Sequence, residues 1–139
     1  DAPEAASAVR RLIGCGSGLT PAGDDLIVGF LAGLWSTRGE DPARRRFMDL
    51  LAAIIEAAAE RTGEVSRAHL RHATRGSVAE PLARLARAIG DAGPTTEVER
   101  VAEVALRVGH TSGSDGVFGL LLGIGCWSGR LTGRELSHG

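Results

Sequence analysis

Two glycine-rich segments that each end in an acidic residue carry the strongest chemical signal in this sequence. The first runs from Gly14 to Asp25 as GCGSGLTPAGDD, and a shorter form, GHTSGSD, runs from Gly109 to Asp115. Each leads into an apolar stretch with glycines at four-residue steps, which is typical of a loop followed by a helix. Backbone N–H groups at a helix start carry partial positive charge and bind anions. The sequence therefore predicts one composite site for a phosphate or carboxylate between the two loops.

Side chains in and beside these loops supply the candidate catalytic groups. Asp25 and Asp115 hold equivalent places and could orient an amide or accept a proton, and His110 is a candidate acid, base or donor to a carbonyl oxygen. The predicted substrate-binding residues offer hydroxyl, carboxylate or backbone groups, and they are Gly16, Gly18, Thr20, Gly23, Asp24, Thr111, Ser112, Gly113 and Ser114. Helix capping is the alternative for the acids and hydroxyls, and for Ser112 it is favoured. The alternative for His110 is a loop histidine bonded to backbone.

Metal binding is a further possibility for the acids. Asp24, Asp25 and Asp115 carry the oxygen ligands that Mg²⁺ prefers, and a bound cation would bridge to a phosphate. His69 and His72 stand three residues apart and could share a metal, but a solvated or hydrogen-bonded pair is favoured because no third ligand lies nearby in sequence. From the same segment, Thr62, Ser66 and an arginine could supply further polar contacts. Cys15 is interpreted as a small residue that fits its loop.

Helices must position these groups. We expect an all-α fold, a single-domain bundle of about seven helices, because Ala and Leu dominate and no convincing strand occurs. The two helices after the loops are apolar on almost every side and should be central and buried. Their repetition suggests an internal pseudo-two-fold relation, with contact through the faces of Gly29, Gly33, Gly119 and Gly123. Only a roughly parallel pair brings both loops to one end, and this is the arrangement that we predict.

The remaining elements are predicted from amphipathic periodicity and from the Thr, Pro and Gly residues at their ends. Thr20 is expected to cap its helix, with Pro21 as the first helical residue. Two capping boxes are expected, Thr96 with Glu99 and Ser112 with Asp115. The further helices are expected over about 3–13, from 42 to about 61, over 64–74 and 77–89, and from about 96 to 108.

Composition narrows the class of protein. The 139 residues form one domain on length alone, 1–139, with 128–139 expected to be a frayed polar tail. A net charge of -1 gives the chain no basic field that would attract nucleic acid. The two cysteines have no metal-site spacing, and the apolar stretches are shorter than the ~20 residues of a membrane span. We therefore expect a cytoplasmic protein with neither nucleic-acid nor membrane partners.

Three strings together carry a resemblance to a known family. GLTPAGDDLIVGFLAGL and GHTSGSDGVFGLLLGI, with RTGEVSRAHLRHATRG between them, resemble the AllH-type subunit of oxamate carbamoyltransferase, formerly a domain of unknown function. The likeness spans about Leu12 to Gly125, and the chain looks like the C-terminal helical portion of usually longer members. The resemblance implies a bacterial role in allantoin (purine nitrogen) degradation. There, a complex of different subunits interconverts oxamate and carbamoyl phosphate with oxalurate and phosphate. The resemblance assigns no catalytic residues to this chain.

Three functional hypotheses follow. The first is a subunit of a carbamoyltransferase complex that binds a small anion at the two loops, where Asp25 and Asp115 position a metal or the substrate amide. The second is a non-catalytic scaffold subunit whose loops and helix faces bind partner chains. The third is a metal-dependent hydrolase of a phosphate or amide bond that uses the three acids.

Overall fold

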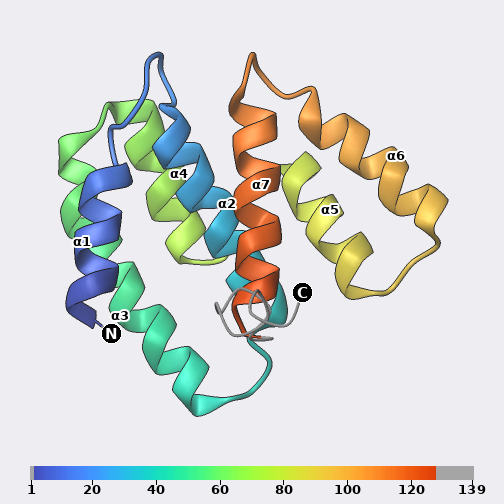
Figure 1. Ribbon diagram of the computed structural model, residues 1–139, viewed down its shortest axis with the longest axis horizontal. Coiled ribbons are helices and arrows are strands. Elements are labelled where there is room, and N and C mark those ends of the chain that lie inside the picture. Colours follow the sequence, from blue (N-terminus) through green and yellow to red (C-terminus); the bar gives the residue numbers. More distant parts are fainter. Residues whose placement is uncertain (1, 128–139) are drawn as a thin grey trace, which may run out of the picture.

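The protein is built from helices throughout the residues that its computed structural model describes, 2–127 (Figure 1). The α-helices are α1 (Ala2–Leu12), α2 (Ala22–Thr37), α3 (Pro42–Ala58), α4 (Glu64–Thr74), α5 (Glu80–Gly90), α6 (Thr95–Leu106) and α7 (Ser112–Cys126), and a short 3₁₀ helix, η1 (Ala59–Arg61), joins α3 to α4. The expected all-α class of about seven helices is confirmed. The frayed tail expected over 128–139 lies outside the described residues.

Helices α2 and α7 form the centre of the fold and meet through their glycines. A Cβ atom added to Gly29 would overlap the backbone of Gly116, and one added to Gly33 would overlap that of Leu120. Later residues of α2 thus meet later residues of α7, so the two helices run in parallel. Figure 1 shows the loops before them at the same end of the molecule. The predicted parallel pairing is confirmed, whereas the pseudo-two-fold relation stays a prediction.

Two hydrophobic clusters flank this central pair. The first packs α1, α3 and α4 against α2 and includes the fully buried Ile55 and Leu70. The second joins α5, α6 and α7 around Leu85 and Leu120, and α2 contributes Ala32 to it. Figure 1 shows α1, α3 and α4 on one side of α7 and α5 and α6 on the other. The two clusters therefore support the central pair from opposite sides.

The expectation that both central helices are buried on almost all sides is wrong for α7. Phe118 is 56% exposed and Leu121 is 53% exposed, although both are large apolar residues. The described contacts of α7 are with α2, α5 and α6, and these helices leave one face of α7 uncovered. The apolar residues of α7 therefore lie partly in the core and partly at the surface.

Helix α5 starts at Glu80 and not at Ser77 as predicted. Pro81 lies in the first turn of α5, and the residue before the helix, Ala79, has an extended backbone with φ -55° and ψ 143°. A start at Ser77 would have put Pro81 further inside, where its missing N–H would remove an intrahelical hydrogen bond. Residues 77–79 instead form an extended link between α4 and α5.

The expected side-chain caps do not form at three helix starts. Pro21, Pro94 and Thr111 are the N-cap residues of α2, α6 and α7, and none of them makes a side-chain capping hydrogen bond. Thr20 therefore does not cap α2. Neither of the two expected capping boxes, Thr96 with Glu99 and Ser112 with Asp115, is present at these starts.

Candidate functional site

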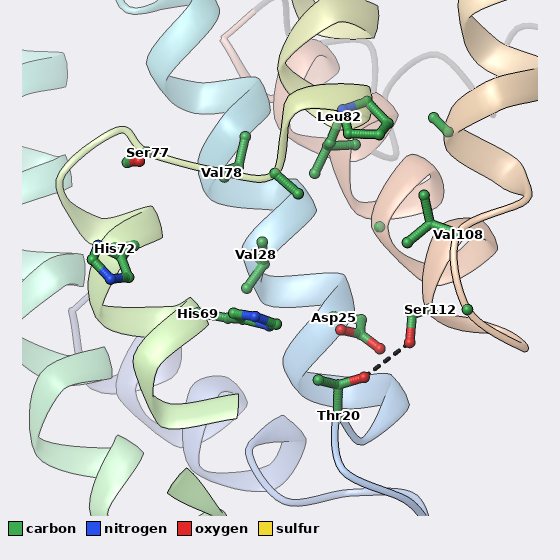
Figure 2. A pocket seen from close by; sticks show the side chains of 16 residues that line it. Thr20, Asp25, Val28, His69, His72, Ser77, Val78, Leu82, Val108 and Ser112 are labelled. Atoms are coloured by element: carbon green, nitrogen blue, oxygen red, sulfur yellow. Dashed lines mark hydrogen bonds between the residues drawn. The ribbon is translucent and has the colours of Figure 1, made fainter. Parts of the chain in front are cut away.

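A cavity of about 420 Å³ lies at the end of the molecule where α2 and α7 begin (Figure 2). Its wall comes from the starts of α2, α5 and α7, the segment after α6 and one face of α4. Apolar side chains such as Val28, Leu82 and Val108 form much of it. The polar side chains are Thr20, Asp25, His69, His72, Ser77 and Ser112. A largely apolar pocket with a few polar groups is the usual form of a small-molecule site.

Three oxygen-bearing side chains from the two predicted loops meet in this cavity. The hydroxyls of Thr20 and Ser112 share a hydrogen bond with their oxygens 2.9 Å apart, and both hydroxyls lie near the Asp25 carboxylate and favour its charged form. The bond between Thr20 and Ser112 uses one of the two hydroxyl protons, whereas a carboxylate can accept several hydrogen bonds. This oxygen cluster (Thr20, Asp25 and Ser112) can therefore accept a further proton donor. The prediction that the two loops converge is confirmed here, and capping, favoured for Ser112, is wrong.

Burial raises the pKa of the half-buried Asp25 carboxyl above its ordinary value of 3.8. Hydrogen bonds from Ser112 and Thr20 oppose this rise, the negative charge of Asp115 adds to it, and His69 counteracts it. Burial dominates because the apolar wall replaces the water that would otherwise solvate the charge. A raised pKa makes Asp25 a better proton acceptor and a stronger partner for an N–H donor than a solvated carboxylate.

Two histidines of α4 complete the polar part of the wall. His69 and His72 both line the cavity, and Figure 2 shows the His69 ring pointing toward Asp25 from the opposite side. His72 lies one helical turn further on, toward Ser77. The sequence favoured a solvated or hydrogen-bonded pair over a metal site, because no third ligand lies nearby in sequence, and both side chains are indeed exposed. The available signal was their three-residue spacing, which places both side chains on one side of a helix.

Asp24 is buried and holds the fold together. Its side chain is 1% exposed, and its two carboxylate oxygens accept hydrogen bonds from the Gly14 N–H at 2.7 Å and from the hydroxyls of Thr62 and Ser66 at 2.5 Å each. These donors belong to the first loop, the end of η1 and the first turn of α4. The expected polar contacts of Thr62 and Ser66 are thus made within the protein. The carboxylate faces these donors and not the cavity.

Two predicted glycines have a packing role. A Cβ added to Gly23 would overlap the carbonyl oxygen of Leu12, and one added to Gly113 would overlap that of Ala105. In both cases the helix before the loop ends against the first turn of the helix after it. Gly113 also lines the cavity. These glycines are needed for close helix contact, which allows each loop to turn back on its preceding helix.

The other predicted residues lie outside the cavity wall. Asp115 is half-buried in the first turn of α7 and acts on Asp25 through its charge. The remaining ones are exposed loop or first-turn residues, namely Gly16, Gly18, His110, Thr111 and Ser114. The structure thus brings together Thr20, Asp25, Ser112 and Gly113 of the predicted set.

The predicted metal ligands do not form one set. Among residues 2–127, no group of three or more His, Cys, Asp and Glu side chains is arranged to hold a metal ion. Asp24 is turned away from Asp25 toward its three donors. Asp24, Asp25 and Asp115 therefore do not form one ligand set in the described residues, and the hydrolase hypothesis loses the three-acid site on which it relied.

The comparison with known families decides the identity of the domain. The sequence matches the family described as oxamate carbamoyltransferase subunit AllH over residues 12–124. The chain belongs to the AllH family. The match extends from the end of α1 into α7, so every cavity-lining residue of this AllH chain lies within the family region. No solved structure matches the chain.

Membership of the AllH family indicates a subunit of an oxamate carbamoyltransferase complex and hence protein partners. None of the helices in residues 2–127 of this AllH chain has the length and apolar character needed to cross a membrane.

Proposed function

We propose that the cavity binds the amide-bearing substrate of an oxamate carbamoyltransferase, and that this chain contributes that site to the complex. The observation that supports it is the oxygen cluster, which combines four side-chain oxygens with only two hydroxyl protons. A primary amide supplies the missing N–H donor. The Asp25 carboxylate would accept a hydrogen bond from this N–H. Because the carboxylate is partly desolvated, such a charge-assisted hydrogen bond is strong.

The anionic end of the substrate meets a weakly positive environment. The described residues that line the cavity include no arginine, and lysine is absent from the sequence. The starts of α2, α5 and α7 border the cavity, and each carries about half a positive charge. These helix ends would neutralise a carboxylate such as that of oxamate. They would also stabilise negative charge that develops on oxygen during carbamoyl transfer.

Calorimetric titration with oxamate and with pyruvate tests the proposal. Pyruvate has nearly the same shape as oxamate but carries a methyl group in place of the amide NH₂. We expect oxamate to bind about 10-fold or more tightly than pyruvate, because a hydrogen bond to a charged group contributes about 1.5–3 kcal/mol. Asp25→Ala should remove this preference. Equal binding of the two ligands by the unaltered protein would contradict the proposal.

Parallel titrations with carbamoyl phosphate and phosphate, with and without Mg²⁺, distinguish the hypotheses that the sequence left open. Binding that depends wholly on Mg²⁺ would return the metal-dependent hydrolase to consideration. Absence of heat with every anion would favour the scaffold. If the proposal holds, the chain acts in the bacterial cytoplasm in allantoin degradation.

A non-catalytic scaffold subunit is the second candidate function. The observation that favours it is the apolar face of α7, where Phe118 and Leu121 are each more than half exposed. Large exposed apolar side chains beside one another on a helix are typical of a protein-binding surface. In a complex of different subunits, another subunit would cover this face. A partner subunit on this face does not by itself exclude the proposed substrate site, because the cavity and the α7 face use different residues.

A further inference from the structure

The position of His69 suggests a chemical role that the oxygen cluster lacks. Thr20 and Ser112 are hydroxyls and Asp25 is a carboxylate, whereas His69 is an imidazole that points at Asp25 from α4 across the cavity (Figure 2). Its side chain is also exposed enough to exchange protons with solvent. An imidazole titrates near neutral pH, so it can both take and return a proton during turnover. A substrate amide held by Asp25 would lie between the two groups.

The fold keeps His69 in this position. Ser66 lies one helical turn before His69 on α4, and its hydroxyl donates to the buried Asp24 carboxylate at 2.5 Å. Asp24 directly precedes Asp25 on α2, so the contact that ties α4 to α2 lies next to both groups. Thr62 makes a second bond of this kind to Asp24. The imidazole is therefore presented to the cavity by a helix that is anchored to α2 at its first turn.

Three titratable side chains face the cavity near α4, whereas the other charged groups described around α4 pair elsewhere. The titratable side chains in the described wall are Asp25 from α2, with His69 and His72 from α4 itself. Glu56 from α3 and Glu60 from η1 pair instead with Arg71 of α4. Asp115 of α7 acts on Asp25. The carboxylate that shares the described cavity wall with His69 is thus that of Asp25.

We propose that His69 is the catalytic base for carbamoyl transfer, an inference that rests on the proposed function. The amide nitrogen of oxamate attacks the carbonyl carbon of carbamoyl phosphate. A C–N bond forms, the C–O bond to phosphate breaks, and phosphate leaves with the bonding electron pair. The amide proton passes to the neutral His69 imidazole and is then given to the departing phosphate. The products are oxalurate and hydrogen phosphate, and in the reverse direction protonated His69 is the acid that returns the proton to nitrogen.

The test compares His69→Gln with the unaltered chain, each assembled with its partner subunits. Phosphate release from carbamoyl phosphate and oxamate is followed from about pH 5.5 to 9, a range that brackets the ordinary histidine pKa of about 6.5. We expect kcat to fall about 10²–10⁴-fold, the range of general acid–base catalysis, while oxamate affinity changes much less. The unaltered complex should gain rate as His69 loses its proton with rising pH. This acid limb should disappear in His69→Gln.

Three further variants provide the controls. Ala68→Gln puts the same side chain at the preceding, exposed position of α4, outside the described cavity wall, and should leave kcat unchanged. His72→Gln and His110→Gln should each keep the acid limb, because His72 lies further along α4 from Asp25 and His110 lies outside the described cavity wall. Melting temperatures of all four variants show whether any loss of rate is a loss of fold.

The possible failures are distinguishable. If His69→Gln keeps kcat within about twofold and retains the acid limb, the catalytic role of His69 is wrong, while the oxamate preference over pyruvate can still hold. If His69→Gln loses oxamate binding but keeps the limb, His69 is a binding residue and the inference also fails. Failure of the unaltered chain to prefer oxamate overturns the proposed function itself.

Discussion

Two neighbouring carboxylates on α2 have opposite environments. Successive residues of a helix are rotated by about 100°, so Asp24 and Asp25 point in different directions. Asp24 meets three donors in the interior, and Asp25 meets two hydroxyls at the edge of a cavity. The first carboxylate is thereby fixed in a structural role. The second can still accept a hydrogen bond from a ligand, and this difference in surroundings separates a structural carboxylate from the one that we propose binds substrate.

Replacing Asp24 should destabilise the fold. Asp24→Ala would leave the Gly14 N–H and the hydroxyls of Thr62 and Ser66 without their acceptor, and we expect the free energy of unfolding to fall by about 2–4 kcal/mol. Urea denaturation measures this change. Asp49→Ala, at an exposed position of α3, is the matched control and should stay within about 0.5 kcal/mol. Equal small effects for both variants would mean that Asp24 is not a structural anchor.

The parallel pairing of α2 and α7 is what joins the two loops into one site. Glycines at the contact let the helices approach until backbone meets backbone, as for Gly119 against the carbonyl oxygen of Leu26. The hydroxyl contact between Thr20 and Ser112 depends on this approach, since the two residues lie 92 positions apart in sequence. Helix packing and site geometry are therefore coupled.

A methyl group at the α2–α7 contact should separate the helices. Gly119→Ala would press its Cβ into the Leu26 carbonyl, and we expect a loss of about 2–3 kcal/mol of unfolding free energy from overpacking. Thermal and urea unfolding measure it. In Gly90→Ala the added Cβ meets nothing within 4 Å at the end of α5, so this control should be neutral or more stable by up to about 1 kcal/mol. Similar behaviour of both variants would argue against a tight contact.

How far the sequence predicts this protein differs between elements. Glycines four residues apart, Gly29 with Gly33 and Gly119 with Gly123, predicted the central contact, because this spacing removes side chains from one face of each helix and lets the two backbones approach. The place of His69 in the cavity wall could not be predicted, because it depends on which residues α4 faces, and the neighbouring sequence does not indicate them. Capping at Ser112 was predicted from local preference, but a partner 92 residues away competes for the same hydroxyl. Local rules fail where a long-range contact offers the side chain a better partner.

At the scale of the whole molecule, the exposed face of α7 is the clearest surface feature. Phe118 and Leu121 are each more than half exposed in this chain, so a polar replacement should cost the isolated protein less stability than one in the core. If a partner subunit covers the face, truncation of a buried aromatic anchor there costs about 2 kcal/mol or more of binding.

We therefore expect Phe118→Ser to leave the melting temperature nearly unchanged and to weaken assembly of the complex by about 10-fold or more. Size-exclusion chromatography with light scattering, on the chain mixed with its partner subunits, measures this effect. Arg107→Ser, at an exposed position after α6, is a control for general surface changes. Unimpaired assembly of Phe118→Ser would place the subunit contact elsewhere.

Elements of both hydrophobic clusters contribute to the cavity wall. Helix α4, which packs in the first cluster, contributes His69 and His72, and Leu82 of the second cluster also lines the cavity. A molecule bound there would contact α4 and α5 at the same time and would link the two clusters. Amide hydrogen exchange should then slow in α4 and α5 together when substrate binds, although these helices belong to separate packing units. In a multi-subunit enzyme, this would let occupancy of a small pocket stiffen the whole domain and be sensed at a distant surface.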